Sequence, residues 1–224
     1  MPPVRFKSSA PTRFLGAAGA ALFLALLVVA PGLATATTLS ATATTFSGAS
    51  LSVAATIDDS SDPGNLVITL FVEDGPRTGD LRGFFADISD DSLLPGLSVS
   101  GPEVTSSTFD ANNVINLGRG SNLNGGGTPC PCDFGVEIGD PGIGHEDDFQ
   151  SVTFVLSHVS QDLDVSIFEE QTFGVRATSV GSANGSRDAS SKLKGKFPVV
   201  PEPSTAILML LGLTGLSIAG SRSD

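Results

Sequence analysis

The sequence contains no tryptophan and no tyrosine, and only two histidines among 224 residues. The rings on which sugars usually stack are therefore limited to phenylalanine, which occurs 14 times. No G-x-S-x-G nucleophile motif is present, and the scarce histidines leave few candidate general bases. We therefore predict that the chain is not an enzyme. A carbohydrate-binding protein is the alternative, followed by a secreted hydrolase whose paired carboxylates only the fold can bring to a working distance.

Basic residues are also scarce, and several of them lie in one short segment. Arg5, Lys7 and Arg13 precede an apolar run from residue 14 to 30, which Pro31-Gly32 and the triplet Ala34-Thr35-Ala36 follow. A positive segment, an apolar segment and a small-residue site in this order are typical of a secretory signal peptide. We predict residues 1–36 as this signal, cleaved after Ala36. An uncleaved membrane anchor is the alternative, although the run is short for a membrane span.

The predicted exported part is strongly acidic. Without residues 1–36 it holds nine basic and 24 acidic residues, a formal charge of −15. Nucleic-acid binding depends on neutralising phosphates with Lys and Arg, so this composition excludes a nucleic-acid partner. It suits solubility or the binding of divalent cations.

The two cysteines, Cys130 and Cys132, are separated by a single proline. An exported protein meets an oxidising environment, which favours a disulfide. The spacing permits a small strained ring between them, and a bridge between two molecules or a pair of free thiols is an alternative. Zinc is disfavoured, because structural zinc sites usually need four ligands and C-x2-C spacing.

Period-two alternation of apolar and polar residues dominates the chain from residue 37 to about 197. Turn signals such as Asp62-Pro63-Gly64 and Asn184-Gly185 separate the alternating segments. This pattern predicts an all-β domain at 37–197, an antiparallel β-sandwich of eight to ten strands resembling a jelly roll. The clearest predicted strands are residues 50–58, 65–73, 81–89, 132–139, 150–158, 164–170 and 171–180.

Residues 118–148 form a long glycine-rich loop with a single predicted strand inside it. Loops of this length are usually functional or disordered. Calcium binds six to eight oxygen ligands, commonly from carboxylates in loops. We therefore name this loop the preferred place for a calcium ion, with solvated surface carboxylates as the alternative. The predicted ligands are Asp140, Glu146, Asp147 and Asp148.

The composition changes after Phe197. Residues 198–205 form a proline-rich spacer, and residues 206–224 hold the uncharged run AILMLLGLTGLSIA and a short tail. We predict a hydrophobic helix that reaches across a membrane only if the bilayer thins, because about 20 apolar residues are normally needed. A terminal core helix is the alternative.

The spacer contains Pro201, Glu202, Pro203, Ser204 and Thr205 directly before this run. In this order the segment from residue 199 to the end resembles the PEP-CTERM sorting signal of Gram-negative bacteria, a segment also known as the ice-binding protein C-terminal domain. A glycosylphosphatidylinositol signal is the alternative, but its polar spacer is missing. The basic cluster that usually ends the family's signal is reduced to Arg222.

The resemblance implies export by the Sec machinery, transient retention in the inner membrane and processing by an exosortase near the Pro-Glu-Pro motif. It also implies a final place at the cell surface or in the extracellular matrix. Proteins sorted in this way are typically associated with exopolysaccharide and biofilm. We therefore expect a non-enzymatic structural or adhesive role for this protein.

Overall fold

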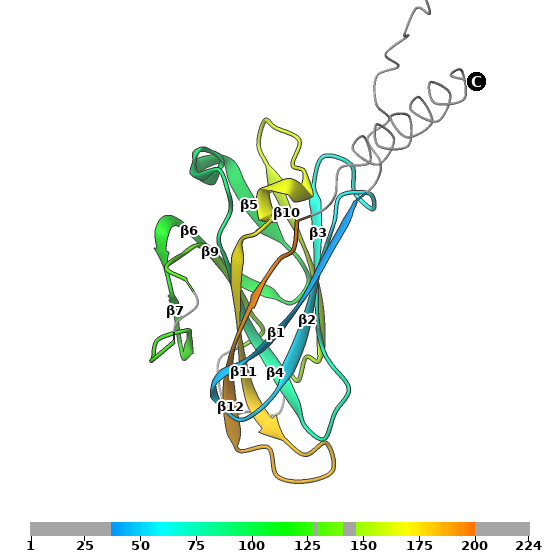
Figure 1. The fold of residues 1–224 in the computed structure, drawn as a ribbon, viewed down its shortest axis with the longest axis vertical. Helices are drawn as coiled ribbons and strands as arrows, with labels where there is room; N and C mark the ends of the chain where they lie inside the picture. Colours follow the sequence, from blue (N-terminus) through cyan, green and yellow to red (C-terminus); the bar gives the residue numbers. More distant parts are fainter. Residues whose placement is uncertain (1–36, 128–129, 141–146, 200–224) are drawn as a thin grey trace, which may run out of the picture. The chain divides into compact units, whose positions relative to one another are not determined.

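The computed structural model describes residues 37–127, 130–140 and 147–199 (Figure 1). Ten antiparallel strands form one sheet in the order β5-β10-β3-β2-β1-β12-β11-β4-β9-β6. They are β1 (Thr38–Gly48), β2 (Ser52–Asp58), β3 (Leu66–Val72), β4 (Thr78–Ala86), β5 (Leu97–Ser100), β6 (Val104–Val114), β9 (Cys132–Ile138), β10 (Ser151–His158), β11 (Thr172–Gly181) and β12 (Ala189–Lys196). The predicted all-β antiparallel fold is confirmed.

The sheet is continuous and curls around its core, so that its two facing layers belong to the same sheet. β4 and β10 are six places apart in the strand order, which would separate them by roughly 30 Å in a flat sheet. Yet the rings of Phe84 on β4 and Phe154 on β10 lie 5.8 Å apart. The sheet stays open along one seam, because its end strands β5 and β6 are not hydrogen-bonded neighbours.

Phenylalanine fills the core that the curled sheet encloses. Phe84 also contacts Phe134 and Phe173, each at a ring-centroid distance of 6.0 Å. These rings are fully buried, and aliphatic residues from every strand of the sheet except β6 and from both short helices surround them. A phenylalanine buries a large apolar area without a polar group that needs a partner. Because the chain has no Trp and no Tyr, its core contains no aromatic N–H or O–H group that would need a hydrogen-bond partner.

One predicted strand was wrong. Residues 164–170 contain the 3-10 helix η2 (Val165–Phe168) instead of a strand. The side chain of Asp164 accepts a hydrogen bond from the backbone N–H of Ser166 at 2.8 Å, which caps the turn. Val165 and Phe168 are both buried, and their separation of three residues fits one turn of a 3-10 helix. A second 3-10 helix, η1, spans Asp91–Gly96.

The excursion begins immediately after β6 and folds onto the outer face of the sheet. We use this name for residues 115–131, which include β7 (Asn116–Gly118) and β8 (Ser121–Asn122). In Figure 1 the β7 segment lies beside β6 and β9. A second apolar cluster lies under it, outside the main core. Its members are Phe85, Val114, Leu123, Cys130 and Cys132, with Phe46 and Leu117 packed against them.

Two features hold the excursion close to the sheet. Gly135 on β9 has no side chain, and a Cβ there would lie only 2.8 Å from Leu117 Cδ2. Polar contacts complete the attachment: Ser121 Oγ donates to the carbonyl of Arg82 at 3.1 Å, and Arg176 Nε donates to the carbonyl of Gly120 at 3.2 Å. The excursion is therefore an ordered cover along its described residues.

Candidate functional site

Half of the sheet presents an uncovered surface of hydroxyl groups. In β5, β10, β3, β2 and the first part of β1, alternate residues point into the core and the others point outward. We call the outward side chains of these strands the hydroxyl face. They are Thr38, Ser40, Thr42, Thr44, Ser52, Ala54, Thr56, Asp58, Val67, Thr69, Phe71, Ser98, Ser100, Ser151, Thr153, Val155 and Ser157.

The strand register aligns the hydroxyl groups in rows across the sheet. Ser40 lies opposite Thr56, Thr56 opposite Thr69, and Thr69 opposite Thr153. Within this row the Ser40 and Thr56 hydroxyl oxygens are 3.3 Å apart, and those of Thr69 and Thr153 are 3.0 Å apart. Each hydroxyl can both donate and accept hydrogen bonds. The row therefore keeps further donor and acceptor capacity for a ligand.

The row of Ser40, Thr56, Thr69 and Thr153 contains no charged side chain, in contrast to the acidic composition of the chain. Charged groups border the hydroxyl face: Asp58 ends β2, Glu73 directly after β3 accepts a hydrogen bond from Thr42 at 3.0 Å, and Lys194 on β12 lies opposite Thr44. Phe71 lies opposite Ala54 on one side and Ser151 on the other, and 45% of its surface is exposed. The site thus combines neutral hydrogen-bonding groups with one exposed aromatic ring. Its recognition from sequence required knowing which strands are neighbours.

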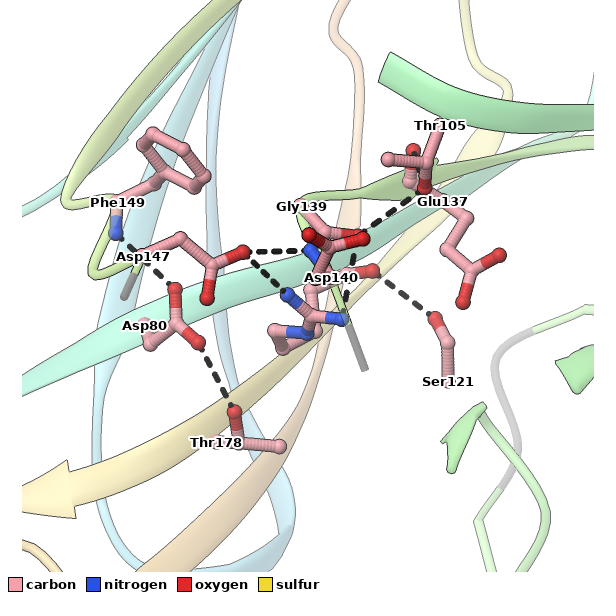
Figure 2. A network of polar contacts seen from close by, with 10 residues as sticks. Asp80, Thr105, Ser121, Glu137, Gly139, Asp140, Asp147, Phe149 and Thr178 are labelled. Carbon is pink, nitrogen blue, oxygen red and sulfur yellow. Dashed lines mark hydrogen bonds and ion pairs between the residues drawn. The ribbon is translucent and has the colours of Figure 1, made fainter. Parts of the chain in front are cut away.

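Of the residues predicted to bind calcium, the described ones are Asp140, Asp147 and Asp148, which lie beside the other half of the sheet. The structure pairs two of them with arginines. Arg82 is buried on β4, and its Nη1 donates to Asp147 Oδ2 at 3.2 Å. The same oxygen accepts the backbone N–H of Asp140 at 2.5 Å, and Arg82 Nη2 donates to the carbonyl of Gly139 at 3.3 Å (Figure 2). Asp147 and Arg82 therefore join the two described ends of the loop.

Asp148 is held in a similar way. Arg187 donates to both of its carboxylate oxygens, at 2.5 and 2.6 Å. These hydrogen bonds lower the pKa of Asp148 below its usual value. Because arginines already neutralise Asp147 and Asp148, a cation would have to displace them to use these carboxylates. Glu146 lies outside the described residues, and calcium binding at this loop stays a prediction.

The same polar network contains buried carboxylates that the sequence analysis did not select. Asp80 accepts hydrogen bonds from the N–H of Phe149 at 3.0 Å and from Thr178 Oγ1 at 3.2 Å (Figure 2). Burial raises its pKa to about 6. Glu137 accepts a hydrogen bond from Ser106 at 2.9 Å, while its Oε1 is buried without a partner. Both acids occupy positions whose side chains point away from the core. From the sequence such side chains are expected to be exposed, because the segments that cover them are recognised only in the folded structure.

Two surface hollows were found among the described residues, with volumes of about 470 and 390 Å³. Pro76 and Arg77 line both of them. Neither includes Asp80 or Glu137, so these buried acids do not face a substrate-sized pocket there. The two carboxylates act as hydrogen-bond acceptors within the covering network.

The structure joins Cys130 and Cys132 in a disulfide, with their Cα atoms 4.8 Å apart. Of the arrangements left open by the sequence, it adopts the bridge within one chain. Both cysteines are buried beneath the excursion. The bridge lies next to Asp87, the first residue after β4, whose carboxylate comes within 4.8 Å of both sulfur atoms.

Comparison with known proteins identifies the C-terminal segment. Residues 199–223 match the PEP-CTERM protein-sorting motif. Comparisons of the chain with curated proteins and with solved structures found no match. The matched segment, with its Pro201–Thr205 motif, lies almost entirely outside the described residues, as do the predicted signal peptide and the hydrophobic run. Within the part of the chain that the structure describes, no helix is long and apolar enough to cross a membrane.

The motif covers only the C-terminal segment, but it indicates how the chain is sorted. It indicates an exported protein that an exosortase processes, directed toward the cell surface of a Gram-negative bacterium. The predicted resemblance of the C-terminal segment is thereby confirmed. The sorting signal carries no information about what the β-sheet domain does after delivery.

Proposed function

We propose that this protein is a non-enzymatic, structural or adhesive component of the bacterial surface or extracellular matrix. Its hydroxyl face binds neutral polysaccharide chains of that matrix. The sorting motif supports the destination, and the uncharged hydroxyl rows of β1, β2, β3 and β10 carry the binding proposal. After processing by an exosortase in the inner membrane, the acidic domain stays soluble and presents this face to the surrounding polymer.

The chemistry of the hydroxyl face matches that of a neutral sugar polymer. Serine and threonine hydroxyls offer donors and acceptors to sugar hydroxyls. Neighbouring strands place them about 4.8 Å apart, and alternate residues on one strand lie about 6.7 Å apart. Phe71 adds a ring against which a sugar can pack. A polyanion is disfavoured, because the rest of the exported chain is strongly acidic.

Affinity electrophoresis tests the binding proposal. We expect gels that contain a neutral glucan to retard the protein, and gels that contain a uronic-acid polymer to leave its mobility unchanged. Phe71→Ala should weaken retardation about two- to tenfold, the range expected from losing one aromatic packing contact. If neutral glucans, mannans and galactans all fail to retard the wild type, polysaccharide binding is wrong.

A matched pair of variants separates the hydroxyl face from a general charge effect. Thr153→Lys places a cation on the row with Thr69 and should reduce retardation. Thr108→Lys makes the same chemical change at an exposed position of β6, outside the hydroxyl face, and should leave retardation unchanged. Equal effects of the two variants would show that the hydroxyl face is not the contact surface.

The sorting step has a separate test in the bacterial host. Without the exosortase, the uncleaved precursor should accumulate in the inner membrane fraction, and the mature form should disappear from the matrix. Alanine at Pro201, Glu202 and Pro203 should give the same distribution. Normal processing of this triple variant would contradict the role of the motif.

A further inference from the structure

A cluster of two sulfur atoms and one carboxylate lies under the excursion, away from the hydroxyl face. Asp87 follows β4 directly, and Ala86 at the end of that strand pairs with Phe134 on β9. Continuing the register by one residue places Asp87 opposite Asp133, beside the start of β9. One carboxylate oxygen of Asp87 and the sulfur atoms of Cys130 and Cys132 all lie within 4.8 Å of one another.

The carboxylate of Asp87 has an unused oxygen. Its Oδ1 is buried and has no hydrogen-bond partner among the described residues. Asp133 beside it is fully engaged, because its two oxygens accept the N–H groups of Ile88 and Asn112, each at 2.8 Å. A buried oxygen of this kind is costly unless a proton or a cation satisfies it.

The charges around Asp87 favour a cation. Burial raises its pKa to about 7, and the negative charges of Asp133 and Asp91 contribute to this shift. The carboxylate therefore experiences like-charge repulsion that a bound cation would relieve.

The disulfide itself contributes little to the stability of the fold. Cys130 and Cys132 are only two residues apart, and the stabilisation expected from closing a loop falls as the loop becomes shorter. Restricting the unfolded chain therefore does not account for the placement of these two sulfur atoms beside Asp87.

We propose that Asp87, Cys130 and Cys132 form a redox-gated site for a thiophilic divalent cation of the zinc class. In the oxidised protein the sulfur atoms are bonded to each other and the site is closed to metal. In the reduced protein two thiolates and one carboxylate oxygen bind the ion. The partly exposed Asp87 leaves the fourth position accessible to water.

The donor set distinguishes this site from the calcium site predicted in the loop. Thiolates select zinc and similar ions, whereas calcium requires oxygen ligands. Tetrahedral zinc with bonds of about 2.0–2.3 Å places its ligand atoms roughly 3.3–3.8 Å apart. The two sulfur atoms are bonded to each other in the oxidised protein and must separate after reduction to reach this spacing, while the Asp87 carboxylate lies within 4.8 Å of both.

The gating step balances with a thiol reductant. Two reductant thiols supply two electrons and two protons, and they leave as a disulfide while Cys130 and Cys132 become thiols. The divalent cation then displaces the two thiol protons, and the proton of Asp87 where it is present, to solvent. Reoxidation by a small-molecule disulfide, which takes up the two electrons and two protons from solvent and leaves as two thiols, breaks both metal–sulfur bonds, re-forms the disulfide and releases the ion.

Cadmium and zinc ions serve as probes on the full-length protein. The chain is reduced with a water-soluble phosphine, which becomes the phosphine oxide with an oxygen atom from water, and is desalted without oxygen. We expect equilibrium dialysis to give one Zn²⁺ per reduced chain and none per oxidised chain. Cd²⁺ should produce an ultraviolet thiolate-to-metal charge-transfer band only after reduction. Absence of the band, or loss of the circular dichroism of the sheet on reduction, overturns the proposal.

Two variants with the same charge change identify the carboxylate ligand. Asp87→Asn should weaken Zn²⁺ binding by at least about tenfold, because it removes a metal ligand. Asp91→Asn removes a neighbouring negative charge at an exposed residue and should change the affinity by less than about threefold, as expected for a screened surface charge. Equal affinities of Asp87→Asn and wild type would contradict the proposed ligand set, whatever the behaviour of the cysteine variants.

Discussion

The two halves of the sheet share one core but differ on their outer faces. The first half, β5-β10-β3-β2-β1, presents the hydroxyl face to solvent. The second half, β12-β11-β4-β9-β6, carries the excursion, buried acids and Arg82 on its outer face. Both halves follow the same inward alternation, so the difference arises from what covers them. Charged groups on a covered face lose their water and are stabilised by protein partners, as Arg82 is by Asp147. Polar groups on an open face remain hydrated and do not require such partners.

Removing a shared core ring should damage both halves together and have the largest effect. Phe84→Ala should lower the free energy of unfolding by about 3–5 kcal/mol, because it leaves a cavity among three other rings. Urea denaturation followed by circular dichroism measures this loss. Phe71→Ala, on the open face, is the control and should cost less than about 1 kcal/mol. Similar losses would mean that the hydroxyl face is packed rather than open.

Removing the buried cation should break the covered half selectively. Arg82→Met removes the cation that pairs with Asp147 and one donor to the carbonyl of Gly139, which should cost about 3 kcal/mol. The control, Lys196→Met, removes an exposed pair with Glu170 and should cost below about 1 kcal/mol. Thermal denaturation compares the two variants. A loss no greater than that of the control would show that the network of Figure 2 does not stabilise this half.

Lifting the excursion should make the covered half resemble the open one. Gly135→Ala pushes against Leu117 and should cost about 1–3 kcal/mol. Hydrogen exchange of the Leu123 amide, which donates to the carbonyl of Ile115, should accelerate with it. Gly126→Ala is the matched control, since a Cβ there meets nothing within 4 Å. Unchanged exchange in Gly135→Ala would argue against close packing of the excursion.

The buried acids should give the covered half a pH dependence. The pKa of Asp80 is raised to about 6 and that of Asp87 to about 7, so the folded protein holds more protons than the unfolded chain between pH 4 and 7. Their contribution to stability is therefore present at low pH and is lost as the pH rises through these values. Asp87→Asn should flatten the pH profile of the free energy of unfolding by about 1 kcal/mol, a value reduced for its partial exposure, as urea denaturation at several pH values would measure. A profile identical to wild type contradicts the raised pKa.

Calcium should have the smallest effect. Arginines already pair with Asp147 and Asp148, so a Ca²⁺ ion at this loop would depend mainly on Asp140 and Glu146, and its binding should raise Tm only slightly. The measurement is a paired thermal denaturation of the oxidised protein with Ca²⁺ and with a chelator. Equal Tm values would contradict the predicted calcium site.

The sequence predicted the strands wherever alternation was clear, as at residues 50–58 and 65–73. It failed at 164–170, because Val165 and Phe168 satisfy both a short strand pattern and a 3-10 turn. The sequence also indicated Asp147 and Asp148 as calcium ligands. Their ion pairs with Arg82 and Arg187 could not be predicted, because these arginines are distant in the chain. The sequence does not single out Asp87, because its proximity to Cys130 depends on the pairing of β4 with β9.

The sequence by itself determined the fold class, the acidic surface and the C-terminal sorting motif, because periodicity, charge and a short linear signal are local properties of the chain. Only the tertiary structure decided which outward side chains remain open and which are covered. That choice depends on contacts between residues far apart in the chain, such as Thr69 with Thr153 or Leu117 against Gly135. The same alternating pattern therefore yields a hydroxyl face on one half and a buried sulfur–carboxylate cluster on the other.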